Sequence, residues 1–182
     1  MLDTPTPPAK STQRLQQLLP QLFDAHLPTG DRYLKVDLDA HNSALIALED
    51  IRESMQTSIH SVTPIPNMPT CILGLMNARN QVLGLVDLAL LMKRALPVAR
   101  GQYYSVVVVQ TPSTSPDSSY LGLAVQNIHG IIRLAADDVQ SSVEDVAGEL
   151  ATFLRGQAVV DGQRLPILDV RAIANAPALQ AA

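Results

Sequence analysis

The sequence predicts a mainly β protein made of two similar small barrels or sheets. The strongest observation is a repeat, because residues 74–88 return 82 positions later as residues 156–170. Five pairs of positions fix the register of the repeat: Gly74/Gly156, Gln81/Gln163, Leu83/Leu165, Asp87/Asp169 and Leu91/Ile173. Residues 48–51 have a second, shorter echo in residues 125–128. Each long copy reads as a strand, a two-residue turn, a strand, and an aspartate that opens a short helix.

Composition narrows the class of protein. The chain has 182 residues, of which 47% are hydrophobic and 16% charged, so it can bury a sizeable core and is not globally disordered. Aromatic residues make up 3% and Trp is absent, which predicts an aliphatic core. The net charge of −4 argues against binding to nucleic acid or to anionic membranes. Without an apolar stretch of membrane-spanning length or a signal peptide, we expect a cytoplasmic protein with no direct membrane insertion.

The first thirty residues read as a leader. Residues 1–12 are rich in Pro, Thr and Ser, which predicts disorder. Residues 13–27 carry an apolar stripe at helical spacing, interrupted by Pro20: Leu15, Leu18, Leu19, Leu22 and Phe23. This amphipathic helix either packs on its own barrel or docks to a partner.

Alternating and buried apolar runs then predict the strands of the first half. Residues 33–38 and 43–48 read as two strands joined by a turn at His41–Ser43. Residues 48–55 form either a short helix or a kinked strand. We expect a further strand over residues 59–65, ended by the prolines that follow.

The repeat units and the strands between them complete the predicted fold. In the first unit, strands 72–78 and 81–86 meet at Arg79-Asn80, where Asn tolerates the positive φ of a tight hairpin. Asp87 is a natural N-cap for a helix over residues 88–93. The second half is predicted to begin with a central strand 103–110, a hairpin tip 111–119, and strands 121–125 and 130–134. A turn over residues 135–138 and a surface loop over residues 139–150 follow. The second repeat unit closes the fold, with its turn at Asp161-Gly162 and with Asp169 capping residues 170–174.

The repeated aspartates raise one enzymatic hypothesis. Duplicated barrels that each donate an Asp are the arrangement of aspartic proteases. That chemistry needs Asp followed by Thr or Ser and then Gly, whereas Leu88 and Val170 follow here, so capping is the better interpretation. Cys71 reads as a buried, inert thiol, and the spacing of the four histidines supports no zinc site. The sequence therefore offers no positive case for an enzyme or for a cofactor.

Arg79 is the residue that could act through a surface. It sits at a predicted hairpin tip between two hydrophobic strands. It is either a solvated turn residue or a binding anchor, since the planar guanidinium is over-represented at interface hot spots.

Three segments together resemble the CheW family of chemotaxis adaptors. They are residues 62–69 with their prolines, residues 74–88 with Gly74, Asn77, Arg79 and Asp87, and residues 121–132 with the strand that begins at Leu121-Gly122. Residues 165–170 look like the closing strand and helix of the family, and the likeness covers about residues 31–176. The leader and residues 47–53 are more similar to cyanobacterial phototaxis and twitching-motility members (PixI- or PilI-like).

The resemblance implies two packed five-stranded β-barrels with short helices and a hydrophobic seam between them. The domains would be a leader (1–30), a CheW-like domain (31–176) and a tail (177–182). It also implies a non-enzymatic adaptor that couples the signalling tip of methyl-accepting chemoreceptors to the regulatory domain of a CheA-type histidine kinase, recruited to receptor arrays at the membrane. The motility system would be chemotaxis, phototaxis or twitching.

The resemblance also implies a receptor-binding site. Five residues match family positions on the receptor-facing groove: Ile51, Glu53, Arg79, Gly122 and Ile128. The kinase-facing surface is expected at the loop ends of the first barrel. Asn80 stands where the family usually has Gly, and we expect the turn to form because Asn permits left-handed geometry. The alternative function is a regulator that binds a small ligand in the seam, although no polar residues converge there in the sequence.

Overall fold

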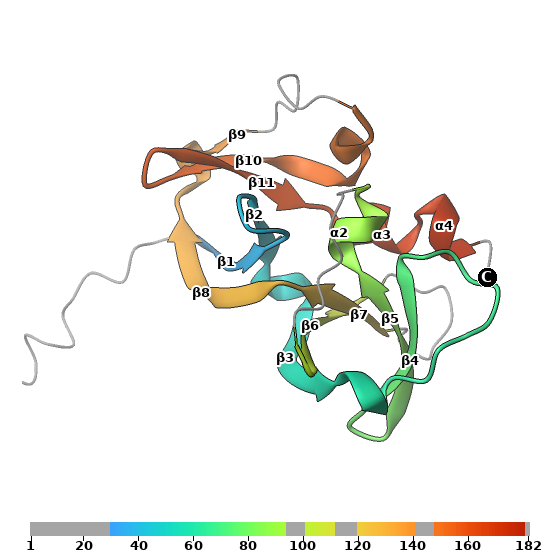
Figure 1. The fold of residues 1–182 in the computed structure, drawn as a ribbon. Helices are drawn as coiled ribbons and strands as arrows, with labels where there is room; N and C mark the ends of the chain where they lie inside the picture. The colour runs from blue at the N-terminus through green and yellow to red at the C-terminus, as the bar shows by residue number, and fades with distance from the viewer. Residues whose placement is uncertain (1–29, 94–100, 112–119, 141–147, 181–182) are drawn as a thin grey trace, which may run out of the picture.

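The protein folds into two curved β-sheets packed face to face (Figure 1). A computed structural model describes residues 30–93, 101–111, 120–140 and 148–180. We name the sheet with strand order β8-β1-β2-β11-β10-β9 barrel A, and the sheet with order β3-β6-β7-β5-β4 barrel B. The strands are β1 (Asp31–Asp37), β2 (Ser43–Ala47), β3 (Ile51–Ser58), β4 (Ile72–Ala78), β5 (Gln81–Asp87), β6 (Tyr103–Gln110), β7 (Tyr120–Val125), β8 (Asn127–Leu134), β9 (Val139–Gln140), β10 (Leu154–Val160) and β11 (Gln163–Leu168). The predicted fold class is confirmed, with the two-residue β9 as a sixth strand in barrel A.

The chain crosses between the two barrels twice. β1 and β2 lie in barrel A, and the chain then crosses through the 3-10 turn η1 (Leu48–Asp50) into β3 of barrel B. β7 lies in barrel B, and the chain crosses back at Gln126 into β8 of barrel A. The two crossings follow the short echo in the sequence. Barrel B is therefore one contiguous segment of chain, from β3 to β7, whereas barrel A is assembled from two segments, β1–β2 and β8–β11.

The long repeat forms two equivalent hairpins. In the first, Arg79 and Asn80 have φ of 43° and 65°, and in the second, Asp161 and Gly162 have φ of 51° and 77°. These left-handed values at both central residues match the twist of the flanking strands. In each barrel the second strand of the hairpin also pairs in parallel with a strand of the other half of the sheet, β5 with β7 and β11 with β2.

Both repeated aspartates cap helices, as predicted. A carboxylate oxygen of Asp87 accepts a hydrogen bond from the Leu90 amide at 3.0 Å, at the start of α2 (Leu88–Leu91). Asp169 accepts from the amides of Arg171 and Ala172 at 2.8 and 3.1 Å, at the start of α3 (Val170–Ala174). The carboxylates thus satisfy backbone donors that have no partner inside the helix.

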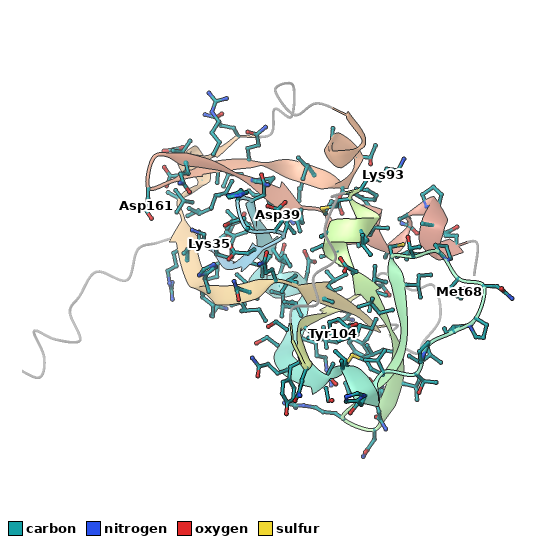
Figure 2. The ribbon with its side chains drawn as sticks, viewed as in Figure 1. Lys35, Asp39, Met68, Lys93, Tyr104 and Asp161 are labelled. Carbon is teal, nitrogen blue, oxygen red and sulfur yellow. The ribbon has the colours of Figure 1, made fainter. Side chains whose placement is uncertain are left out.

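Three aliphatic clusters form the core. The largest lies between the barrels and takes side chains from both sheets and from α2 and α3, for example Val36, Val107, Leu123, Leu168 and Ile173. A second cluster fills barrel B, where Tyr104 packs against it (Figure 2), and a third fills barrel A. The seam expected from the sequence is thus a closed core. Burial of this apolar surface holds the barrels together.

One predicted strand is wrong. Residues 59–65 form the 3-10 turn η2 (Ile59–Ser61) and an irregular segment instead. The Ser58 hydroxyl accepts from the His60 amide, and only Thr63 pairs, exchanging two 2.8 Å backbone hydrogen bonds with Leu75. The close approach depends on Gly74, because a Cβ there would lie 2.2 Å from the Thr63 carbonyl oxygen. The prolines of this segment prevent a longer ladder.

Other expectations are met in part. Residues 48–55 contain both alternatives, a 3-10 turn and a strand. β9 and η4 (Gly148–Phe153) replace parts of the predicted surface loop. In the predicted tail, α4 (Pro177–Gln180) places Ala178 and Leu179 against the central core. The predicted leader helix and the hairpin tip over residues 112–119 lie outside the described residues.

Gly122 lies on the inner side of barrel B, at a position where a larger residue would crowd the surrounding side chains. A Cβ there would lie 3.0 Å from Cδ1 of both Leu83 and Leu85 and 3.3 Å from Cγ1 of Val106. Leu45 occupies the equivalent position of barrel A, opposite Ile167. The two leucines of barrel B therefore fill the space that a side chain takes in barrel A.

Gly122→Val is expected to lower the free energy of unfolding by about 1–3 kcal/mol, because the added methyl groups overpack the barrel B core. Gly130→Val is the matched control, since a Cβ at Gly130 has no atom within 4 Å. Urea unfolding of both variants measures the difference. Equal losses in the two variants would contradict this account of Gly122.

Candidate functional site

A polar cleft of about 260 Å³ lies at one end of barrel B. β3 contributes Arg52 and Glu53, the β4–β5 turn contributes Arg79 and Asn80, and β7 contributes Tyr120. β3 and β4 are the two edge strands of this sheet, so no backbone ladder joins them. Side chains close the barrel here.

An ion pair between Glu53 and Arg79 spans the two edges. The Nε of Arg79 lies 2.7 Å from Oε2 of Glu53. The Glu53 side chain is 17% exposed, whereas the Arg79 side chain is 78% exposed. Because this contact uses Nε, it leaves the Nη1–Nη2 fork out of the pairing. The ion pair thus positions an exposed guanidinium at the rim, although a pair this open adds little stability.

A second contact in the cleft joins Arg52 to Tyr120. The Arg52 guanidinium lies over the ring, with Cζ 4.9 Å from its centroid, and Nη1 donates to the hydroxyl at 2.7 Å. The combination of a cation–π contact and a hydrogen bond orients both side chains. Sequence reasoning did not select either residue. Arg52 directly follows the first copy of the short echo, which is the signal that could have identified it.

The structure divides the five predicted site residues into three groups. Glu53 and Arg79 meet directly. Ile51 and Ile128 are equivalent residues at the two strand crossings, and both are half-buried against the central core, at the margin of the seam. Gly122 lies beneath the cleft, against Leu83, with its backbone paired to Val108. Its place is in the barrel wall.

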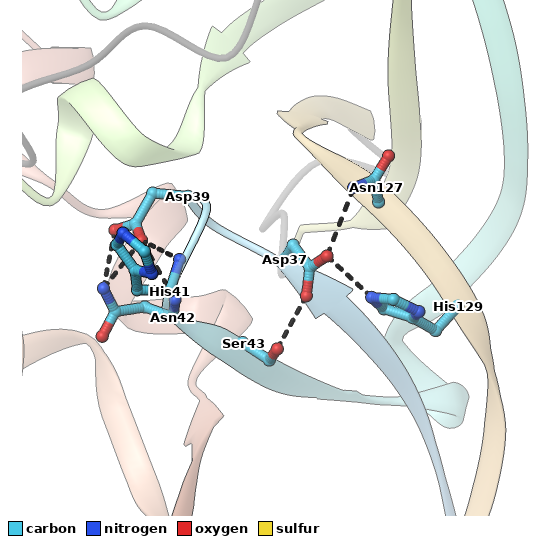
Figure 3. Close-up of polar contacts among 7 residues, drawn as sticks. All are labelled: Asp37, Asp39, His41, Asn42, Ser43, Asn127 and His129. Carbon is cyan, nitrogen blue, oxygen red and sulfur yellow. Dashed lines mark hydrogen bonds and ion pairs between the residues drawn. The ribbon is translucent and has the colours of Figure 1, made fainter.

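A polar hub on the other side of the seam fastens β8 to β1 and β2 (Figure 3). Asp37 accepts hydrogen bonds from the Ser43 hydroxyl at 2.6 Å and from the Asn127 amide at 3.3 Å. Its Oδ2 lies 2.7 Å from Nε2 of His129. Burial raises the pKa of Asp37, but these hydrogen bonds and the charge of His129 outweigh it and hold the pKa below its usual value.

A charged cleft borders barrel A at the β2–β3 crossing. Arg155 contacts Glu49 at 3.3 Å, and Asp50, Asp169 and Arg171 complete the lining. Burial raises the pKa of Asp50. Three carboxylates and two guanidiniums thus line the cleft, and this mixture of charges selects no single ligand.

The described residues also include a cysteine, possible metal ligands, short helices and an apolar cavity. Cys71 is buried, as predicted, and burial raises the pKa of its thiol, which disfavours the reactive thiolate. Among the described residues, no three His, Cys, Asp or Glu side chains gather in a geometry for a metal ion. Within the same residues, the helices are too short or too polar to cross a membrane. An apolar cavity of about 490 Å³ is lined from the helices and η4, by residues such as Leu91, Phe153 and Ala172.

Comparison with known proteins shows which family the chain resembles. A family model described as the CheW-like domain matches residues 32–178. The chemotaxis protein CheW of Rhizobium meliloti (strain 1021) is 27% identical over 150 residues, which cover 81% of this chain and 90% of that protein. The chemotaxis protein CheW of Treponema pallidum (strain Nichols) is 23% identical over 124 residues, covering 67% and 71%.

The fold also matches a solved structure. The crystal structure of the scaffolding protein TtCheW from Thermoanaerobacter tengcongensis superimposes with a TM-score of 0.70, at 17% identity, covering 82% of this chain and 96% of that one. The match extends over both barrels, as the resemblance in the sequence implied. The chain belongs to the CheW-like domain family.

Proposed function

We propose that this CheW-like chain is a non-enzymatic adaptor of chemotaxis signalling that couples methyl-accepting chemoreceptors to a CheA-type histidine kinase. The family match over residues 32–178 supports this role. The observation that carries it is the cleft of barrel B, where Glu53 holds an exposed Arg79 at the rim. A rigidly held guanidinium on an aliphatic scaffold is suited to recognition of another protein.

The receptor surface runs along the margin of the seam. Because the central core is closed, the helical tip of a receptor lays its apolar residues along Ile51 and Ile128, at the half-buried edge of the core. This is a helix-in-groove mode of recognition. The Nη fork of Arg79 binds a carboxylate or a backbone carbonyl of the receptor at the rim.

The kinase surface lies on the outer face of the β4–β5 hairpin. Val82 is 71% exposed and Leu75 is 39% exposed, which is unusual for aliphatic side chains on neighbouring strands. Leu75 and Asn77 share a face of β4, and Val82 pairs with Asn77. An apolar patch on an edge hairpin suits contact with a barrel of the kinase regulatory domain.

Both contacts are modest in area, and their effect comes from repetition in a receptor array. Linked weak contacts raise the effective concentration of each partner. The adaptor would thus be recruited to arrays at the cytoplasmic side of the membrane. The similarity of residues 47–53 to PixI- or PilI-like members favours a phototaxis or twitching system over swimming.

Among the described residues, a small ligand, the alternative function, finds no open space inside the central core, although an apolar cavity borders this core through Leu91 and Ala176. Buried side chains of both sheets fill the space between the barrels. The apolar cavity of about 490 Å³ is lined from the helices and η4.

Arg79→Ala should weaken binding of a receptor tip fragment by about 1–3 kcal/mol, as for a hot-spot arginine, and leave the kinase contact intact. Asp161→Ala is the matched control, because Asp161 occupies the same turn position of the other hairpin with a similar positive φ. Titration calorimetry with each partner, plus thermal unfolding, measures both effects. A lower melting temperature with unchanged receptor affinity would show that Arg79 is only a structural turn residue.

Val82→Glu should weaken binding of the kinase regulatory domain at least about tenfold, since a charge is then buried in an apolar contact. Receptor binding and stability should stay unchanged, because Val82 is largely exposed in the free protein. Val159→Glu, an exposed valine on β10 of barrel A, is the control. If the two variants bind the kinase domain equally well, the contact lies elsewhere.

A further inference from the structure

The two strands that follow the crossings, β3 and β8, begin with equivalent irregularities. In β3, Ile51 pairs with Val109 and Glu53 with Val108, so Arg52 is the extra residue of a β-bulge. In β8, Ile128 pairs with Val36 and Gly130 with Lys35, so His129 is the extra residue. Each bulge follows directly after the short echo in the sequence. A bulge re-aims the side chains around it, so each extra residue is free to contact a neighbouring strand.

The side chain of each extra residue makes a polar contact with a residue on another strand of the same barrel. Arg52 reaches Tyr120, with Nη1 2.7 Å from the hydroxyl. His129 reaches Asp37, with Nε2 2.7 Å from Oδ2, and Asp37 in turn accepts from Ser43. Ser43 pairs with the last residue of β1, and Tyr120 pairs with the last residue of β6. Ser43 and Tyr120 are therefore equivalent, and the polar contacts of Arg52 and His129 lie at equivalent places in the two barrels.

The chemistry of the two contacts differs in one respect. A guanidinium stays cationic at all physiological pH values. An imidazole, in contrast, changes charge in the range of pH 5 to 8. The contact in barrel B is therefore insensitive to pH, whereas the one in barrel A is built from a group that titrates.

We propose that His129 and Asp37 form a pH-dependent latch that holds the start of β8 in barrel A, with Arg52 and Tyr120 as its pH-independent counterpart in barrel B. The cationic imidazole donates a charge-assisted hydrogen bond to the carboxylate, and deprotonation leaves a weaker neutral contact. The Asp37 carbonyl also accepts from the Gln126 amide at 2.9 Å, so the latch sits where the chain crosses between barrels.

The charged groups around the latch are few. β1, the strand paired with β8, carries Asp31, Arg32 and Lys35 in addition to Asp37, and β8 itself adds Arg133. The β1–β2 turn contributes Asp39 and His41, where Asp39 accepts from the His41 amide at 2.9 Å. Of these groups, His129 is the one within ion-pair distance of Asp37. The His129 side chain is 49% exposed, so it exchanges protons readily with solvent.

The latch bears on recognition because β8 carries Ile128. A looser start of β8 lets this side chain move away from the margin of the seam. This consequence rests on the proposed receptor surface, but the latch itself does not. A test on the isolated protein therefore separates the two.

The test is amide hydrogen exchange of the full-length protein at pH 6 and pH 8, with protection factors corrected for intrinsic rates. Protection of residues 127–129 should fall about two- to fivefold at the higher pH, the range of an exposed ion pair, while β3 stays constant. His129→Gln should remove the pH dependence. His129→Arg should remove it too and keep protection high, because it copies the Arg52 contact. Equal pH responses in wild type and in both variants, or none in wild type, would overturn the latch.

At acidic pH, the stability that the latch contributes depends on the ionisation of Asp37. Because its pKa is lowered in the folded protein, the ionised carboxylate adds stability above the unfolded value of 3.8, and this is lost as pH falls through the folded value. The difference in unfolding free energy between wild type and Asp37→Asn should therefore be constant from pH 5 to 6 and shrink towards pH 3. Urea titrations at each pH measure it, and Ser43→Ala should reduce the effect by removing one donor. A difference that is independent of pH would contradict this role of Asp37.

Discussion

The core that the two barrels share is the constraint on which the rest of this structure depends. Barrel B is one contiguous segment, β3–β7, inserted between β2 and β8, so barrel A is completed only when the chain returns from barrel B. The central cluster draws aliphatic side chains from both sheets and from the two short helices. Because neither barrel buries its apolar face alone, and the two segments of barrel A meet only after barrel B, we expect the two barrels to fold as one cooperative unit.

The polar contacts described above form where the chain crosses between the barrels and at the barrel edges. Each barrel keeps open edges, and an edge strand presents unpaired backbone groups unless something covers or distorts it. In barrel B, Glu53 and Arg79 connect the two edges, and Arg52 fixes the bulge of β3 on Tyr120. In barrel A, Asp37 holds the bulge of β8 through His129 and Asn127. The residues proposed to recognise partners are thus the ones that finish the barrels.

An adaptor of this design acts through the positions of its surfaces. The aliphatic core keeps the seam closed, so partners are offered its margin, with Ile51 and Ile128 at equivalent crossings. The cleft of barrel B adds an exposed guanidinium, and the β4–β5 hairpin adds an exposed apolar face. Under the proposed assignment, the receptor and the kinase occupy separate surfaces, the margin of the seam and the hairpin face. In the proposed latch, the two bulge contacts differ in chemistry, since an imidazole takes part in barrel A and a guanidinium in barrel B.

Structural features that depend on residues close together in the chain could be predicted from the sequence. The repeat predicted both hairpins and both capped helices, because left-handed turn residues and N-cap carboxylates act on neighbours in the chain. The run Val106–Val109 predicted a buried strand, and it is fully buried. Tertiary structure decided which strands pair. Alternation indicates which face of a strand is buried but not which sheet it joins, so the crossing of β3 into barrel B and the return of β8 to barrel A could not be predicted. For the same reason the Asp37–His129 contact, between residues 92 positions apart, and the pairing of Glu53 with Arg79 became visible only in the folded chain.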